Sequence, residues 1–146
     1  MAKARKPKED QDSGPYLDAA LVCEQVIREK DGAFSAIRLV NRLTIHDVAP
    51  ASGTTLVSPL MLLVSFKAGE FNGSQELSLY VEDPSRSRHD LYQRTTLTFQ
   101  GGDTGQTVAA PLLLTYDKDG IYWVEVLLDR KRYSRIPLSL SFDGSR

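Results

Sequence analysis

Residues 120–142 read GIYWVEVLLDRKRYSRIPLSLSF, two apolar runs on either side of a charged turn. Apolar residues occupy every second position of each run, which is the period of a strand with one buried face. The inward positions are Tyr122, Val124, Val126 and Leu128 in the first run, and Ile136, Leu138, Leu140 and Phe142 in the second. Residues 129–132 join the runs, so the stretch predicts a β-hairpin. Pro137 has no N–H to donate, which places the second strand at a sheet edge or beside a locally unpaired position.

Further strands follow from the same alternation upstream. Their inward positions are Leu60, Leu62, Val64 and Phe66; Leu77, Leu79 and Val81; Leu97 and Phe99; and Leu112, Leu114 and Tyr116. The turn-forming pairs Asn72-Gly73 and Asp83-Pro84 separate these runs, and the glycine-rich residues 101–105 are expected to form a flexible loop. Short apolar runs about ten residues apart, with turns between them, are typical of a β-sandwich or barrel.

The first part of the body, up to residue 45, fits two patterns. A helix capped by Asp18 could cover residues 19–29, or residues 30–32 could form the turn of a hairpin. In the hairpin, Leu21, Cys23 and Ile27 share one face of the first strand. The hairpin fits the alternation better and brings the total to about eight strands. We therefore predict an all-β fold, an antiparallel two-sheet β-sandwich of about seven to nine strands, immunoglobulin-like or related.

The composition fits one soluble domain behind a polar arm. The chain has 146 residues, 41% of them apolar and 25% charged, with a formal net charge of −1. A chain of this length buries about two-thirds of its surface in one core. Residues 1–15 contain no large apolar side chain after Met1, so we predict a disordered arm there and a single domain over residues 16–146.

Several locations and classes are disfavoured. No apolar run approaches the roughly 18 residues of a membrane span, and the basic N-terminus lacks the apolar segment of a secretory signal. We therefore expect a cytoplasmic protein without membrane contact. The single Cys23 excludes an internal disulfide framework, and its apolar surroundings favour a buried thiol that packs as a small hydrophobe.

Three segments carry a resemblance to a known family. They are ALVCE at residues 20–24 with KDG at 30–32, IRLV at 37–40, and the closing stretch from Gly120 to Leu138. Together they resemble a family of short uncharacterised bacterial β-sandwich proteins, over residues 17–142. The resemblance implies a compact β-sandwich. It implies no catalytic residue, because the family has no assigned activity.

Candidate catalytic and metal-ligating residues are few. His46 and His89 each precede an aspartate that could orient an imidazole, so a small enzyme would centre on one of them. Neither histidine has ligand spacing to another His or Cys, which makes solvated loop histidines the preferred interpretation. Loop aspartates clustered at one end of a β-sandwich can bind calcium, and the candidates are Asp83, Asp117, Asp119 and Asp129. The spacing of Asp117 and Asp119 is also common in ordinary turns. We predict no catalytic residue, no metal site and no cofactor.

An apolar outer face is the most informative anomaly of the pattern. Ile121, Trp123 and Leu127 lie opposite the inferred inward face of their strand, and Met61 and Leu63 do the same on theirs. Val22 and Val40 could join them. Large apolar patches are rarely left bare, so these side chains suggest a protein interface. The alternatives are that the N-terminal segment covers this face, or that the inward and outward sides are reversed.

Two further sets of residues suggest other ligands. Arg130, Lys131, Arg132 and Arg135, with Tyr133 among them, could contact an anion or nucleic acid. A second basic run, at Arg86 and Arg88, could lie elsewhere. The body holds 14 basic against 16 acidic residues, which disfavours nucleic acid. Trp123, Tyr80 and Tyr92 could instead stack on a carbohydrate.

The pattern as a whole favours a non-catalytic interaction or assembly module. It would bind a protein partner, or a second copy of itself, through a sheet face or edge. The alternatives are the anion or nucleic-acid binder, the carbohydrate-binding module and the small enzyme described above.

Overall fold

The protein is built from strands alone in the residues that the structure describes, which are 14–46, 56–114 and 118–144 of a computed structural model. The strands are β1 (Tyr16–Arg28), β2 (Phe34–Leu39), β3 (Arg42–Ile45), β4 (Leu56–Glu82), β5 (Arg88–Asp90), β6 (Thr95–Leu114), β7 (Gly120–Leu128) and β8 (Lys131–Phe142). The all-β prediction is confirmed. Within these ranges no helix has the length and apolarity needed to cross a membrane. Residues 1–13 of the predicted arm lie outside the described residues.

The hairpin alternative for the first part of the body is correct, and the helix alternative is wrong. β1 pairs with β2 in antiparallel register, from Cys23 opposite Leu39 to Arg28 opposite Phe34. The turn is closed by backbone hydrogen bonds in which Gly32 N donates to Glu29 O at 3.0 Å and Glu29 N donates to Ala33 O at 2.7 Å. The apolar alternation in the sequence on both sides of the Lys-Asp-Gly turn was therefore a better guide than a single capping residue, although burial itself does not alternate along β1 and β2.

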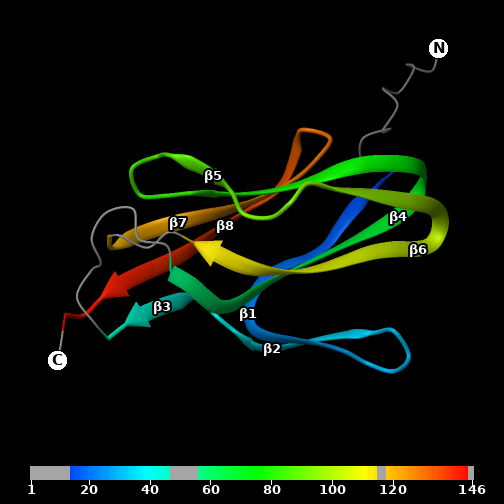
Figure 1. The fold of residues 1–146 in the computed structure, drawn as a ribbon. Coiled ribbons are helices and arrows are strands. Elements are labelled where there is room, and N and C mark those ends of the chain that lie inside the picture. Colours follow the sequence, from blue (N-terminus) through cyan, green and yellow to red (C-terminus); the bar gives the residue numbers. More distant parts are fainter. Residues whose placement is uncertain (1–13, 47–55, 115–117, 145–146) are drawn as a thin grey trace, which may run out of the picture.

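Strands β4 and β6 are much longer than the pattern predicts. Each joins two runs that the sequence analysis treated as separate strands. Asn72 lies opposite Gln100 and Gly73 opposite Phe99, so Asn72-Gly73 is no turn. The glycine-rich residues 101–105 are part of β6, which corrects the expected flexible loop. In Figure 1 each of the two strands is one long ribbon, and both bend at the end of the molecule away from the C-terminus.

The bend exchanges the inward and outward faces of both strands. Between the pairs Lys67–Gly105 and Gly69–Gly102, β6 advances three residues while β4 advances two. Between Gly69–Gly102 and Asn72–Gln100, β4 has the extra residue. Each extra residue is a β-bulge, and a shift of one residue turns every later side chain to the other face. Gly69 and Gly102 take the left-handed φ values of 62° and 61° that such a bend requires.

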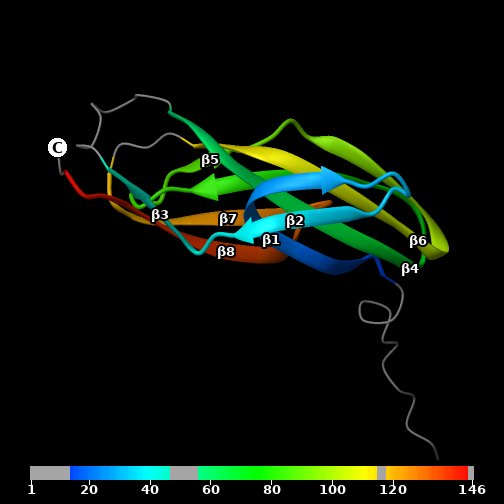
Figure 2. The ribbon, with the colours of Figure 1, turned by 90° about the horizontal axis from the view of Figure 1, so that it is seen from below.

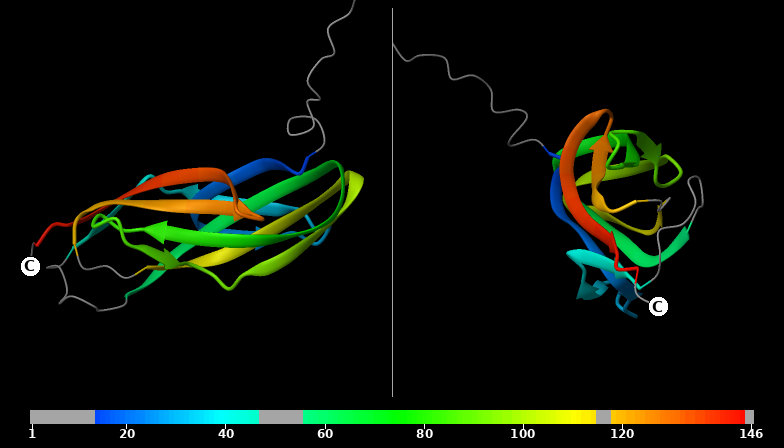
Figure 3. Two further views of the ribbon diagram at one scale, coloured as in Figure 1. Left: turned by 90° about the horizontal axis from the view of Figure 1, so that it is seen from above. Right: turned by 90° about the vertical axis from the view of Figure 1, so that its left-hand side faces the viewer.

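The bulges allow one strand to serve two layers. The first half of β4 lies between β1 and β6, and its last part lies beside β7. The sheet order is therefore β2-β1-β4-β7-β8-β3, with β5 and β6 also paired to β4. Seen end-on, the strands curve around a common centre (Figure 3). The predicted two sheets are thus two layers of one continuous sheet.

The core fills the space between the layers. Its apolar side chains come from even positions in the first half of β4 and from odd positions after the bend. The members from β4 are Leu60, Leu62, Val64, Phe66 and Ala68, then Leu77, Leu79 and Val81. β6 changes phase in the opposite sense, from Leu97 and Phe99 to Ala110, Leu112 and Leu114. Val22 is also a core residue and Val40 packs against the core, so the expectation that they join an outer face is wrong.

The sheet is mixed, which corrects the prediction of a purely antiparallel one. β3 pairs in parallel with the end of β8, from Arg42 opposite Ser139 to Ile45 opposite Phe142. The connection after β2 crosses from one layer to the other, so β3 arrives in the direction in which β8 runs. β3 reaches β8 only from Ser139 onward, and in the described residues Pro137 is paired on the β7 side alone. β8 lies between β7 and β3 and is not an edge strand, so of the two alternatives for Pro137 the locally unpaired position is correct.

The bend provides a test of the fold. We expect Gly102→Val to lower the free energy of unfolding by about 2 kcal/mol, because an L residue is strained at positive φ. No atom lies within 4 Å of the added Cβ, so the loss reflects backbone conformation rather than a clash. Asp103→Val, at an exposed neighbouring position, should change it by less than about 0.5 kcal/mol. Equal values in urea unfolding would contradict the role of Gly102.

Candidate functional site

Strands β4, β5, β7 and β8 form one outer surface of the sheet, and the outward side chains of β7 lie within it. Trp123 lies opposite Glu82 of β4, and Glu125 lies opposite Tyr80. On the other side, Glu125 lies opposite Arg135 of β8. Three arginines, Arg88, Arg132 and Arg135, cover these residues, and we call this surface the arginine face.

Glu125 is the centre of the arginine face. Its carboxylate is buried, with a residue exposure of 3%. Arg88 donates to Oε1 from Nε at 3.2 Å and from Nη2 at 3.1 Å, and Arg132 donates to Oε2 from Nη1 at 3.1 Å. A buried carboxylate without such partners would be strongly destabilising. The two basic runs that the sequence analysis separated therefore meet on one carboxylate.

Guanidinium groups also cover the aromatic rings of this face. The Arg88 guanidinium lies 4.4 Å from the Tyr80 ring centroid, and that of Arg135 lies 4.0 Å from the Trp123 ring. Arg135 Nη2 donates to Glu82 Oε2 at 2.7 Å. One ring face of Tyr80 and one of Trp123, both proposed as carbohydrate platforms, are therefore occupied by the protein's own cations.

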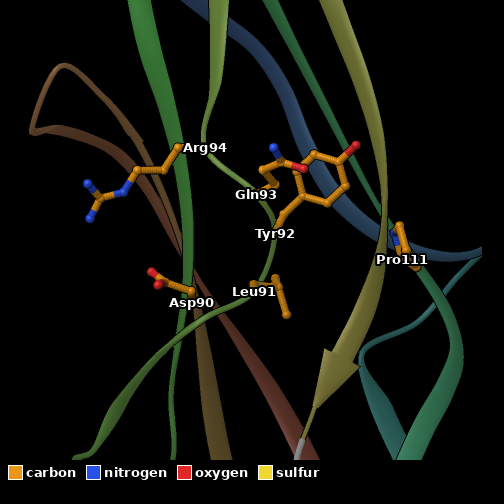
Figure 4. A pocket seen from close by; sticks show the side chains of 6 residues that line it. All are labelled: Asp90, Leu91, Tyr92, Gln93, Arg94 and Pro111. Atoms are coloured by element: carbon orange, nitrogen blue, oxygen red, sulfur yellow. The ribbon is translucent and has the colours of Figure 1, made fainter.

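The third aromatic residue of the carbohydrate alternative lies elsewhere. Tyr92 is half-buried in the connection between β5 and β6, beside Leu91 and facing Pro111 across a shallow hollow (Figure 4). The Asp90 and Arg94 side chains point away from the Tyr92 ring in this view. The three aromatic residues therefore do not form one platform.

A bulge in β8 arranges the predicted basic cluster. Val126 lies opposite Ser134 but Leu127 lies opposite Arg132, so Tyr133 is the extra residue. Because of this bulge, both Arg132 and Arg135 reach the arginine face. Lys131 does not: it lies opposite the core residue Leu128, and its Nζ is 5.0 Å from the Tyr133 ring. The turn itself is only Asp129 and Arg130, both at positive φ.

Two hollows flank Glu125 along β7. The first, of about 330 Å³, lies between the loop after β4 and the start of β7, and Pro84, Arg86, Ile121, Trp123 and Arg135 contribute to its wall. The second, of about 290 Å³, lies at the other end and includes Tyr80, Arg94, Leu127 and Arg130. Ile121 is 47% exposed, Trp123 is half-buried and Leu127 is buried. Each hollow thus combines apolar side chains with arginines.

Arg86 and Arg130 differ from the other arginines of these hollows. Within the described part of the chain, neither has a carboxylate within ion-pair distance. Both take positive φ values in turns, 72° and 69°. Arg94, in contrast, donates to the Tyr80 hydroxyl at 3.2 Å, and this hydrogen bond raises the pKa of Arg94. Each hollow therefore contains one guanidinium that has no carboxylate within ion-pair distance among the described residues.

The other two predicted interface residues lie on a different layer. Met61 and Leu63 belong to the half of β4 that pairs with β1 and β6. Leu63 is buried and lines a groove with Arg28 and Phe34, because the β1–β2 hairpin lies over the outside of this layer (Figure 2). The five predicted interface residues therefore lie on two separate surfaces.

The histidines pair with carboxylates other than their sequence neighbours. His46 Nδ1 contacts Asp143, and His89 Nε2 lies 3.0 Å from Asp83 Oδ2. His46 follows β3 as expected, whereas His89 lies in the short strand β5 rather than in a loop. Asp47, the predicted partner of His46, lies outside the described residues, and Asp90 is not the partner of His89.

Asp83 organises the loop between β4 and β5. Its Oδ1 accepts hydrogen bonds from Ser85 N at 2.9 Å, Ser85 Oγ at 2.7 Å and Ser87 N at 3.0 Å. Burial raises the pKa of Asp83, but the hydrogen bonds from His89, Ser85 and Ser87 outweigh it and lower the pKa to about 2. The loop that presents Arg86 is thus held by an ionised carboxylate.

The remaining candidate groups are placed as follows. In residues 14–46, 56–114 and 118–144, no three His, Cys, Asp or Glu side chains gather closely enough to hold a metal ion. Asp117 lies outside the described residues, and Asp119 Oδ1 accepts a hydrogen bond from Phe142 N at 2.7 Å. Cys23 is fully buried, as predicted, and burial raises the pKa of its thiol.

Sequence reasoning missed the roles of Glu125 and Glu82, and it considered Asp83 only as a turn residue and a loop aspartate for calcium. A usable signal existed for Glu125, which is the one charged residue in the apolar run IYWVEVLL. A carboxylate in such a run requires cationic or hydrogen-bonding partners from neighbouring strands. The sequence does not show which strands those are.

Comparisons with known proteins add little to this description. Neither a protein family nor a curated protein matches the sequence. Among solved structures, the chain is similar to an immunoglobulin-like protein from Pseudomonas aeruginosa, with a TM-score of 0.42 and 10% identity. The match covers 89% of this chain and 98% of that protein. No fold class, residue role or activity follows from a similarity of this degree.

The Glu125 ion pairs can be tested by a double-mutant cycle. Arg88→Ala and Arg132→Ala should each cost about 1 kcal/mol in free energy of unfolding, because the other arginine still binds Glu125. The double variant should cost about 3–5 kcal/mol, because the buried carboxylate then loses both cations. Urea unfolding measures all three. Arg86→Ala is the control and should be nearly neutral, and a purely additive double variant would contradict this role of Glu125.

The depressed pKa of Asp83 predicts a pH effect with a definite sign. Its stabilisation should be complete above the ordinary value of 3.8 and should disappear as the pH falls towards about 2. Asp83→Asn should therefore lower the free energy of unfolding at pH 7 and have little effect near pH 2. Urea titrations of both proteins across this range provide the measurement. A difference independent of pH would show that the ionised form of Asp83 is not what holds the loop.

Proposed function

We propose that the protein is a non-catalytic binding module and that it binds a protein partner through the arginine face. The observation that carries this proposal is the partly exposed pair Ile121 and Trp123 beside stacked arginines. Ile121 is 47% exposed, and the Arg135 guanidinium lies 4.0 Å from the Trp123 ring. Tryptophan, tyrosine and arginine are the residue types that contribute most to binding energy at protein interfaces.

The construction of the face supports binding by a rigid surface. Trp123, Glu125 and Leu127 lie on one strand whose two neighbours, β4 and β8, are both paired to it. The arginines are held by carboxylates and rings before any partner arrives, so little side-chain entropy is lost on association. Ion pairs at both Glu82 and Glu125 fix their geometry.

The charge distribution favours a protein over a nucleic acid. Of the four predicted anion contacts, Arg132 and Arg135 are already bound to Glu125 and Glu82. Acidic side chains also line both hollows, including Glu82 in one and Glu76 in the other. A continuous phosphate backbone would meet these carboxylates, whereas a protein partner can place charges individually.

Photo-cross-linking from the face tests the proposal. We expect a photoreactive phenylalanine analogue at position 121 to form a specific adduct in cells that make the protein. Arg135→Ala should lower the yield of this adduct at least tenfold, because it removes the guanidinium that stacks on Trp123. An analogue at position 39 is the matched control, because Leu39 is a 64% exposed apolar residue on β2. Mass spectrometry identifies the adduct, and light scattering shows whether the partner is a second copy.

Two outcomes would contradict the proposal. Adduct formation from position 39 and not from position 121 would place binding at the β2 edge. Adduct formation from neither position, with both proteins folded, would show that the arginine face is a solvated surface without a protein partner.

A further inference from the structure

We propose that the arginine face binds an extended acidic segment of a partner protein, with two carboxylate side chains four residues apart. This inference rests on the proposed function and specifies the chemistry of the partner. It is carried by the two hollows on either side of Glu125 and by the one guanidinium in each, Arg86 and Arg130, that makes no ion pair with a described carboxylate.

The spacing of the two carboxylates is inferred from the positions of the two hollows along β7. Trp123 belongs to the first hollow and Leu127 to the second, and they lie four residues apart on one straight strand. A strand rises about 3.3 Å per residue, so the Cα atoms of Trp123 and Leu127 are about 13 Å apart. An extended peptide has the same rise, and its residues i and i+4 point to the same side. A peptide that runs along β7 therefore reaches both hollows with side chains four residues apart.

The charge of the bound segment is inferred from which charged side chains of the two hollows already have partners. In the first hollow, Glu82 binds Arg135 at 2.7 Å and Asp83 accepts three hydrogen bonds through Oδ1, while Arg86 has no carboxylate partner among the described residues. In the second hollow, Asp129 Oδ1 accepts from Glu76 N at 2.7 Å, and Arg94 lies 4.0 Å from Glu76. Arg130 is again the cation without a described carboxylate partner. A carboxylate of the segment in each hollow would give this guanidinium an ion-pair partner, beside Asp83 and Asp129, which are already hydrogen-bonded.

The centre of the face fits a neutral side chain between the two acids. Glu125 already binds Arg88 and Arg132, and the Arg88 guanidinium covers the Tyr80 ring. A third carboxylate there would approach the Glu125 charge, and a cation would approach two guanidinium groups. The segment is therefore acidic at its two contact positions and uncharged between them.

Two synthetic peptides of identical composition test the spacing. The first, TETVTET with blocked ends, has its glutamates four residues apart; the second, TETVETT, has them three apart and pointing to opposite sides when extended. Trp123 is the only tryptophan of the chain, so its fluorescence reports binding at the first hollow. We expect the first peptide to bind at least about tenfold more tightly, as calorimetry on the full chain can confirm.

Charge-removing variants test the two cations. Arg86→Gln and Arg130→Gln should each weaken binding of TETVTET about tenfold, the size expected for one lost charge-assisted hydrogen bond. Lys131→Gln is the matched control, because Lys131 neighbours Arg130 but lies opposite the core residue Leu128. It should leave the affinity unchanged. All three positions are exposed, so the variants should fold.

The outcomes separate this inference from the proposed function. Equal affinity for the two peptides, no binding of either, or an equal loss in Lys131→Gln would overturn the acidic-segment inference. If a partner nevertheless cross-links from position 121, the proposed function stands without it. If cross-linking fails as well, both are wrong. If single-stranded oligothymidylate binds more tightly than TETVTET, the acidic-segment inference is wrong and the face prefers a phosphate backbone.

Discussion

A strand that serves two layers must exchange its buried and exposed faces where it passes from one layer to the other. β4 and β6 meet this constraint at Gly69 and Gly102, with one extra residue in each strand and left-handed backbone at both glycines. Without the exchange, Leu77, Leu79 and Val81 would face solvent while Tyr80 faced the core. Core packing, the pairing of β4 with β7 and the composition of the outer surface all depend on this bend.

The arginine face shows how an apolar outer surface can be kept in water. Trp123 and Leu127 are too large to leave bare on the outside of a sheet, and Ile121 is the one of the three that remains well exposed. Arginine covers apolar neighbours with its stem and stacks its planar group on aromatic rings. Carboxylates from other strands then fix each guanidinium, as Glu125 of β7 does for Arg88 of β5 across the intervening β4. The resulting surface is charged, and its arginine side chains are held in place by ion pairs and ring contacts.

The apolar alternation in the sequence predicted the strands in which it runs without interruption. It did not predict strands in which the buried face changes part-way. β7 and β8 are correct because Tyr122 to Leu128 and Ile136 to Phe142 keep a constant phase. β4 was divided in two because a phase change resembles a turn when only one strand is visible. The partners of Glu125 lie 37 and 7 residues away in the sequence. No periodicity encodes such pairings, so the trio Ile121, Trp123 and Leu127 could be named while its arginine cover could not.

The parallel pairing of β3 with β8 has a consequence for how the molecule assembles. Arg42 meets Ser139, so this contact can form only after most of the chain has been synthesised. Closing so long a loop costs entropy that is recovered only at the end. During synthesis, β3 therefore has no partner until β8 has left the ribosome. Leu43 and Ile45, which pack against the core in the folded protein, therefore reach their final surroundings only at the end of synthesis.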